Sequence, residues 1–118
     1  MNALAALAVD PAPPGAGLRP FELKGDAYEP ELRGGSFLMV APASRHHYDG
    51  DYLLDFGDGE APFRAAICSN GQIEVWHPNP RYSRWRLSRA EFEAAVTAIV
   101  VAEVKVKDER RIRQAVAP

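Results

Sequence analysis

The sequence predicts a small, mainly β domain with antiparallel strands and one short helix. Between residues 18 and 106, short apolar runs alternate with glycine, proline and aspartate at intervals of about ten residues. Asn70-Gly71 has the composition of a tight hairpin turn, since both residues tolerate positive φ angles. The β-branched run 97–106 is typical of a long strand rather than a helix.

The same patterns place each element along the chain. Asn70-Gly71 connects two strands in a hairpin, and Asp58-Gly59 marks a second turn. Ser88 and Glu91 have the spacing of a capping box, which predicts a short helix over 89–95. We expect strands at 18–24, 36–41, 51–57, 62–68, 71–77, 83–87 and 97–106.

The chain of 118 residues fits one domain with two terminal extensions. A domain of this size buries about two thirds of its unfolded surface, which is enough for a modest core. Residues 1–17 form an Ala/Pro-rich arm, because the prolines and glycines of 10–17 block regular pairing. Residues 18–106 form the β domain, and 107–118 form a charged tail that is helical at most in part.

Composition excludes several functional classes. With 47% hydrophobic residues, 25% charged residues and a net charge of -2, the chain resembles an ordinary globular protein, neither a polycation nor a disordered acidic segment. The single cysteine, Cys68, excludes an internal disulfide and fits a reducing compartment. The apolar run 1–9 lacks the basic residues of a signal peptide and is too short to span a bilayer. We therefore expect a cytoplasmic protein without membrane contact.

Residues 25–42 run from a tight turn into a hydrophobic strand, Gly-Asp-Ala-Tyr-Glu-Pro-Glu-Leu-Arg-Gly-Gly-Ser-Phe-Leu-Met-Val-Ala-Pro. This stretch resembles the Gly-Asp-Ser-Met-x-Pro-x-Leu-x-x-Gly-Asp-x-Leu-x-Val signature of the LexA-type self-cleaving repressors. Their relatives include the CI phage repressors, UmuD-like proteins and, more distantly, type I signal peptidases. Residues 48–54 resemble the second Asp-Gly-Asp strand entry of this family, 59–64 the strand that ends in its catalytic lysine, and 78–82 its Asn-Pro-x-Tyr turn. The resemblance covers 18–106 and implies a LexA/signal-peptidase-like β domain.

The resemblance also implies a Ser-Lys hydrolase that has lost its reactive pair. In the family, a serine attacks a peptide carbonyl and a neutral, desolvated lysine accepts its proton. Here Ala27 stands at the serine position, Tyr28 replaces the adjacent methionine, and Arg64 falls at the lysine position. A methyl group cannot attack, and an arginine keeps its proton at physiological pH. We predict a pseudo-peptidase with no catalytic residues and no cofactor.

Other reactive side chains have simpler interpretations. The run 46–51 collects imidazoles and carboxylates, but adjacent side chains in a strand point to opposite faces, so we favour an exposed polar loop over a metal site. Ser36 stands where the family has an aspartate, and no base is placed by sequence to activate it. Nothing near Cys68 in the sequence would lower its pKa, so we expect it to pack at a strand end.

Residues 81–89 interleave arginines with two aromatic residues, which is a composition typical of polyanion binding. Strand alternation offers a simpler interpretation, in which Ser83, Trp85 and Leu87 face inward and the neighbouring arginines are solvated. We favour a solvated or partner-facing strand over direct nucleic-acid contact. The basic run 105–113 is a second, weak indication of a polyanion partner. The candidate polyanion contacts are Arg81, Arg84, Arg86 and Arg89.

A surface for binding proteins is the function that the resemblance implies. In the family, C-terminal domains pair with one another and the closing strand contributes to that pairing. Carried over to this chain, 97–106 would recruit another strand through an unprotected edge. The expected partner-binding residues are Thr97, Ile99, Val101, Glu103 and Lys105.

We therefore expect a non-catalytic LexA/CI-like interaction and dimerisation module in phage or SOS-type transcriptional regulation, for example an antirepressor that binds a related repressor. Its partner would be a second copy or a LexA/CI-like regulator. Direct reading of DNA is not expected, because 1–17 are too few residues for a helix-turn-helix. One alternative is a UmuD-like accessory subunit of a translesion DNA polymerase. Another is a serine peptidase inactivated by an engineered Ser-to-Ala change at Ala27, although this would not explain Arg64.

Overall fold

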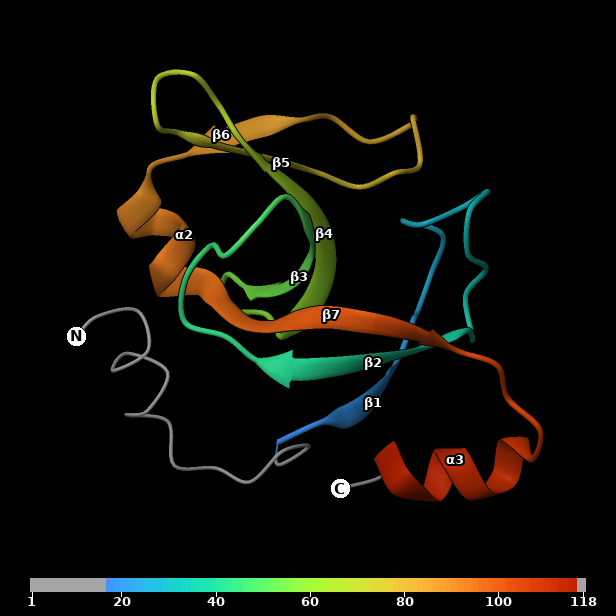
Figure 1. The fold of residues 1–118 in the computed structure, drawn as a ribbon. Coiled ribbons are helices and arrows are strands. Elements are labelled where there is room, and N and C mark those ends of the chain that lie inside the picture. Colours follow the sequence, from blue (N-terminus) through green and yellow to red (C-terminus); the bar gives the residue numbers. More distant parts are fainter. Residues whose placement is uncertain (1–16, 117–118) are drawn as a thin grey trace.

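A computed structural model describes residues 17–116 of the chain. The strands form one seven-stranded sheet in which all neighbouring pairs run antiparallel (Figure 1). This architecture confirms the predicted mainly β class. The strands are β1 (Arg19–Glu22), β2 (Phe37–Pro42), β3 (Gly50–Asp55), β4 (Glu60–Ile67), β5 (Ile73–Trp76), β6 (Trp85–Leu87) and β7 (Val96–Val104), and the helices are α2 (Arg89–Ala95) and α3 (Glu109–Val116).

Each predicted strand has a counterpart, with differences at the ends. β5 begins at Ile73 because Asn70 and Gly71 form the turn: the N–H of Gly71 donates to the carbonyl of Cys68 at 2.9 Å, and Gly71 has a φ of 84°. β6 is shorter than predicted and begins at Trp85. Of residues 17–116, no helix is long and apolar enough to cross a membrane.

The predicted capping box starts α2. The Oγ of Ser88 accepts the N–H of Glu91 at 3.0 Å, and the Glu91 carboxylate accepts the N–H of Ser88 at 2.7 Å. Val96 then adopts an extended conformation (φ −69°, ψ 135°), so the helix ends where the β-branched run begins. The helix therefore passes into β7 without an intervening loop.

The strand order corrects one prediction. The order is β1-β2-β7-β3-β4-β5-β6, which puts β7 inside the sheet and makes β1 and β6 its edges. β7 pairs with β3 over residues 96–99 and with β2 over residues 98–104. The prediction of an unprotected edge along 97–106 is therefore wrong for the first half of β7. Beyond residue 99, β7 is paired on the β2 side alone.

Two β-bulges curve the sheet. Both bulges are in β7. Thr97 is the extra residue where β7 pairs with Leu53 and Leu54 of β3, and Val101 is the extra residue where β7 pairs with Met39 and Val40 of β2. Because of the curvature, Arg19 on β1 reaches Glu60 on β4 and pairs with it at 2.6 Å, although three strands separate β1 from β4. The Oγ1 of Thr97 donates to the same carboxylate at 2.6 Å. The side chain of Glu60 thus joins β4 to β1 and to β7 across the curved sheet.

Strand alternation divides the core between the two faces of the sheet. Tyr52 and Leu54 point to one face and Leu53 to the other, and all three are fully buried. On the first face, α2 covers the sheet and buries Phe92 completely. On the second face, Leu23 and Tyr28 of the segment 23–35 pack over Leu53 and its neighbours, which are Leu38, Val40 and Ala98.

We expect the substitution Phe92→Ala to lower the free energy of unfolding by about 3–5 kcal/mol, since it removes a fully buried ring beneath α2. Denaturant unfolding followed by circular dichroism measures this loss. Glu93→Ala, at an exposed position of the same helix, is the control and should change the stability little. A loss below 1 kcal/mol for Phe92→Ala would mean that α2 does not close the core.

Candidate functional site

The loop between β1 and β2 places residues 25–28 against the sheet. The N–H of Leu23 donates to the carbonyl of Ser36, and the N–H of Gly35 donates to the carbonyl of Leu23, each at 2.8 Å, so the loop is closed at its base. Gly34 approaches Gly25 so closely that an added Cβ would lie 2.6 Å from the Gly25 carbonyl oxygen. A residue with a side chain at position 34 would therefore force the loop apart.

Ala27 lies where the resemblance places a nucleophile, and it is held by the turn that resembles the family's Asn-Pro-x-Tyr motif. The Ala27 side chain packs, half-buried, against the core cluster of the second face. Its carbonyl accepts the N–H of Asn79 at 2.9 Å, and the Asn79 side-chain amide donates to the carbonyl of Asp26 at 2.8 Å. Two segments far apart in the sequence are thus joined at this point.

Asp26 strengthens the same junction. The Tyr82 hydroxyl donates to Oδ1 of Asp26 at 2.5 Å, and Arg81 donates to Oδ2 at 2.9 Å. The hydrogen bond from Tyr82 holds the pKa of Asp26 below its ordinary value, and it raises the pKa of Tyr82. Asp26 is therefore a carboxylate at neutral pH, and its role is to fix the loop.

Arg64 lies at the centre of a group of polar residues beside this loop. Its Nε donates to Oδ1 of Asp51 at 3.1 Å, and its two terminal nitrogens donate to the two oxygens of Glu31 at 3.0 Å each. The Tyr28 hydroxyl donates to the same Asp51 oxygen at 2.7 Å. The guanidinium carbon is 5.8 Å from the centre of the Tyr28 ring. We call Tyr28, Glu31, Asp51 and Arg64 the Arg64 cluster.

The electrostatics of the Arg64 cluster fix its protonation. Hydrogen bonds to Glu31 raise the pKa of Arg64, and the same contact lowers the pKa of Glu31. Burial raises the pKa of Tyr28 well above its ordinary value, with a further contribution from the Asp51 charge. Arg64 is therefore charged and Tyr28 neutral at physiological pH. Neither residue can take a proton from a neighbouring hydroxyl as a general base would.

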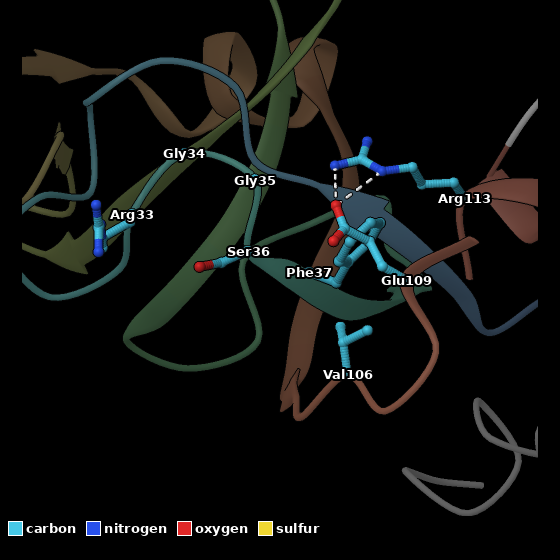
Figure 2. A pocket seen from close by; sticks show the side chains of 8 residues that line it. All are labelled: Arg33, Gly34, Gly35, Ser36, Phe37, Val106, Glu109 and Arg113. Carbon is cyan, nitrogen blue, oxygen red and sulfur yellow. Dashed lines mark hydrogen bonds and ion pairs between the residues drawn. The ribbon is translucent and has the colours of Figure 1, made fainter. Parts of the chain in front are cut away.

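The other candidate nucleophile, Ser36, lines a hollow of about 420 Å³ between the start of β2 and α3 (Figure 2). On the opposite side of this hollow, Arg113 pairs with Glu109 at 2.6 Å. Arg113 also pairs with Glu22 on β1 at 2.6 Å. Figure 2 shows the Ser36 side chain pointing away from this ion pair. The side chains that line the hollow therefore do not converge on the hydroxyl.

The histidine-rich run is exposed at residues 47–49, as predicted, but the ring of His46 is not. This ring stacks on Tyr52 with centroids 5.7 Å apart, and its side chain is only 7% exposed. Its Nε2 lies 3.2 Å from Oδ1 of Asp49. Within residues 17–116, no three His, Cys, Asp or Glu side chains are grouped so that they could hold a metal ion. Cys68 is half-buried at the end of β4.

Two of the four candidate arginines, Arg81 and Arg84, lie beside acidic side chains. Arg81 binds Asp26, and Arg84 lies 3.6 Å from Glu74 while its guanidinium carbon is 4.2 Å from the centre of the Trp76 ring. Arg86 lies opposite Glu74 in the β5–β6 pair, and Arg89 is the first residue of α2. The contacts of Arg81 with Asp26 and of Arg84 with Glu74 thus reduce the positive charge that the sequence places in 81–89.

The structure also separates the predicted partner-binding residues. Thr97 is bonded to Glu60, and Ile99 is 7% exposed in the core beneath α2. Val101, Glu103 and Lys105 are exposed, and they belong to the part of β7 beyond β3 or follow directly after it. Only this second half of the predicted surface can contact a partner.

A row of aromatic rings that the sequence did not predict lies along the sheet surface. Trp85, predicted to face inward, is 39% exposed, while Leu87 on the same strand is buried as predicted. The ring of Trp85 contacts Phe63 at 5.5 Å and Phe56 at 6.4 Å. These residues are scattered along the chain without a period, so only the sheet order could reveal the row. We call the following residues the aromatic row: Phe56, Phe63, His77, Tyr82 and Trp85.

Comparison with known proteins identifies no relative, because no family model, no curated protein and no solved structure matches the chain. The resemblance of 18–106 to the LexA-type family therefore stays a prediction.

The pKa of Glu31 leads to a prediction about acid stability. Its folded-state pKa is below the ordinary value of 4.5, so its contribution is complete above that pH and is lost as the pH falls through the folded pKa. We expect Glu31→Gln to lower the stability by about 0.5–1 kcal/mol at pH 7 and low salt, since the pair with Arg64 is half exposed. This difference should be smaller at pH 3, which is below the ordinary pKa at which the unfolded chain takes up the proton.

Chemical denaturation of the wild type and Glu31→Gln at both pH values checks this expectation. Glu93→Gln, an exposed carboxylate on α2, is the matched control. An equal loss of stability at pH 7 and pH 3 would contradict an electrostatic role for the pair.

Proposed function

We propose that this chain is a non-catalytic, LexA/CI-like protein-interaction module that self-associates and acts in cytoplasmic transcriptional regulation. The observation that carries the proposal is the state of Arg64. It is next to the loop that presents Ala27, and two carboxylates hold it charged through three hydrogen bonds. A position used for proton transfer in a hydrolase is thus occupied by a permanent cation with a structural task.

The proposal explains why the loop is preserved without chemistry. Asp26, Ala27 and Tyr28 bond to two different parts of the domain: the 79–82 turn holds the first two, and Asp51 holds the third. These contacts stabilise the cover over the second core face. The residues that would surround a reactive serine instead hold the loop over the core. The proposed function then lies on the surface of the domain.

We expect the variant Ala27→Ser to remain inert. A serine there would have no base, because Arg64 cannot accept its proton. The double variant Ala27→Ser/Arg64→Lys should also be inert, since Glu31 and Asp51 would keep the lysine charged. Labelling with a serine-reactive fluorophosphonate probe and electrophoresis for chain cleavage test both variants, with Ser36→Ala included in each to remove background. Labelling or cleavage of either variant would contradict a non-catalytic function.

The outer half of β7 is the surface that supports self-association. Beyond residue 99 the strand has lost β3 as a neighbour, so one backbone edge of 100–104 is unpaired within the described sheet. The bulged residue Val101 is 47% exposed, and Ala102 and Glu103 are exposed beside it. A strand edge with unpaired N–H and carbonyl groups pairs readily with another strand. A second copy would supply such a strand.

We expect Val101→Lys to weaken self-association about tenfold or more, because a charge on an exposed strand opposes pairing. Sedimentation equilibrium over a range of concentrations measures the dimer constant. Ile67→Lys is the matched control, since Ile67 is 45% exposed at the far end of β4. Self-association unaffected by Val101→Lys, or a wild type that is monomeric at every concentration and binds no LexA/CI-like regulator, would contradict the proposal.

Coprecipitation from the native host identifies a partner other than the chain itself. A LexA/CI-like repressor fits the proposed function, whereas a translesion polymerase would instead support an accessory polymerase subunit.

A further inference from the structure

The free edge of β7 carries two charges whose order is complementary to itself. Glu103 and Lys105 are both exposed, and they lie one on each side of Val104, the last residue of the strand. Among residues 17–116, neither of them forms an ion pair within its own copy. An antiparallel strand with the same sequence presents these charges in reverse order, so the edge matches a second copy of the chain.

The two outer edges of the sheet are protected. β6 has only three residues, and Arg84 and Arg86 put positive charges before and within it. β1 is joined to β4 by the ion pair between Arg19 and Glu60, and α3 packs against it. Within the part of the chain that the structure describes, the edge of 100–104 therefore remains the one most open to another strand.

Symmetry limits how two copies can pair along this edge. If one sheet continues through both copies, the two-fold axis is perpendicular to the sheet and every residue keeps its face. Directly opposite residues must point to the same face, so the axis passes through a residue and not between two residues. Ile99 is still paired with Tyr52 of β3. A ladder of five residues from each copy must therefore be centred on residue 102 or later.

The charges and the bulge favour an axis at Val104. A ladder centred on Glu103 or on Lys105 would place two like charges directly opposite each other, which is unfavourable. A ladder centred on residue 102 would include the bulge at Val101, where the extra residue interrupts regular pairing. An axis at Val104 instead places Glu103 of each copy opposite Lys105 of the other. Two ion pairs then flank the axis.

The course of the chain after β7 fits this register. Residues 105 and 106 lie outside any helix or turn, and the chain bends at Lys107 before α3 begins. Figure 1 shows β7 continuing along β2 past the end of β3 and then leading to α3. In the register centred on Val104, residues 102–106 of one copy pair with the same residues of the other. The ladder therefore ends before it reaches Ile99, and the pairing of β7 with β3 remains intact.

We propose that Glu103 and Lys105 determine the partner of the β7 edge, because they select a second copy of this chain in the register centred on Val104. The inference rests on the self-association proposed above and adds to it the register and the residues that give specificity. A partner strand with another order of charges would bring like charges together or leave both residues unpaired.

Sedimentation equilibrium of the full chain with reversed charges tests the proposal. We expect Glu103→Lys and Lys105→Glu each to weaken self-association about tenfold, because two ion pairs per dimer become two contacts between like charges. The double variant Glu103→Lys/Lys105→Glu should regain the wild-type association. An equimolar mixture of the two single variants should also associate, since every charge then faces its opposite. Glu93→Lys, at an exposed position of α2, changes the net charge as Glu103→Lys does and is the control.

Disulfide cross-linking measures the register directly. In a Cys68→Ser background, Val104→Cys should form a covalent dimer with oxidised glutathione, because directly opposite residues have Cα atoms about 4.5–5.5 Å apart. Ala102→Cys should not, because the two copies of this residue would be four positions out of register, which is about 13 Å along the strand. Non-reducing electrophoresis separates the two results.

The outcomes separate this register from the proposed function. If Val101→Lys weakens association but neither charge reversal does, or if cross-linking occurs at residue 102 and not at residue 104, the register is overturned and the interaction module stands. If both reversals weaken association and neither the double variant nor the mixture restores it, the contact between Glu103 and Lys105 is overturned in the same way. A wild type that is monomeric at every concentration overturns the inference, and the proposed function then depends on binding to a LexA/CI-like regulator.

Discussion

The structure depends on one carboxylate oxygen, Oδ1 of Asp51. It accepts hydrogen bonds from the hydroxyl of Tyr28 and from Nε of Arg64, and in this way it joins the 23–35 loop to the centre of the sheet. Tyr28 is only 3% exposed, so without Asp51 its hydroxyl would be buried without this partner. The loop in turn covers Leu53 and Ala98 on the two central strands. Core, loop and candidate site are therefore stabilised by the same interaction.

Much of the fold could be predicted because its signals are local. Alternating burial along β5, the glycine turn at residue 71 and the capping box at Ser88 each depend on a few adjacent residues. The place of β7 could not be predicted in this way. Its β-branched sequence indicates a strand, but whether that strand lies at an edge or in the centre is decided by pairing with residues far away in the chain.

In the candidate site, too, some features could be predicted from the sequence and others depend on contacts between distant residues. The family resemblance predicted that Ala27 and Arg64 lie in one region, and the structure brings Arg64 to Tyr28, the neighbour of Ala27. The role of Glu31 was not predicted, because an acidic residue in a polar loop has many possible partners. The aromatic row was missed for a related reason: Trp85 follows an alternation that predicts burial, and its exposure results from the short edge strand β6, which has a neighbour on one side only.

The paired hydrogen bonds between Arg64 and Glu31 constrain which residues positions 31 and 64 can hold. Both terminal nitrogens of the planar guanidinium are used at once, at 3.0 Å each, and an ammonium group cannot reproduce that fork. A mutation to lysine at residue 64 would lose one of the two hydrogen bonds to Glu31. A mutation that removes the carboxylate at residue 31 would leave Asp51 alone to balance the charge of Arg64. The two positions are therefore coupled, and replacing the arginine by another cation without a matching change at residue 31 would lower the stability of the loop.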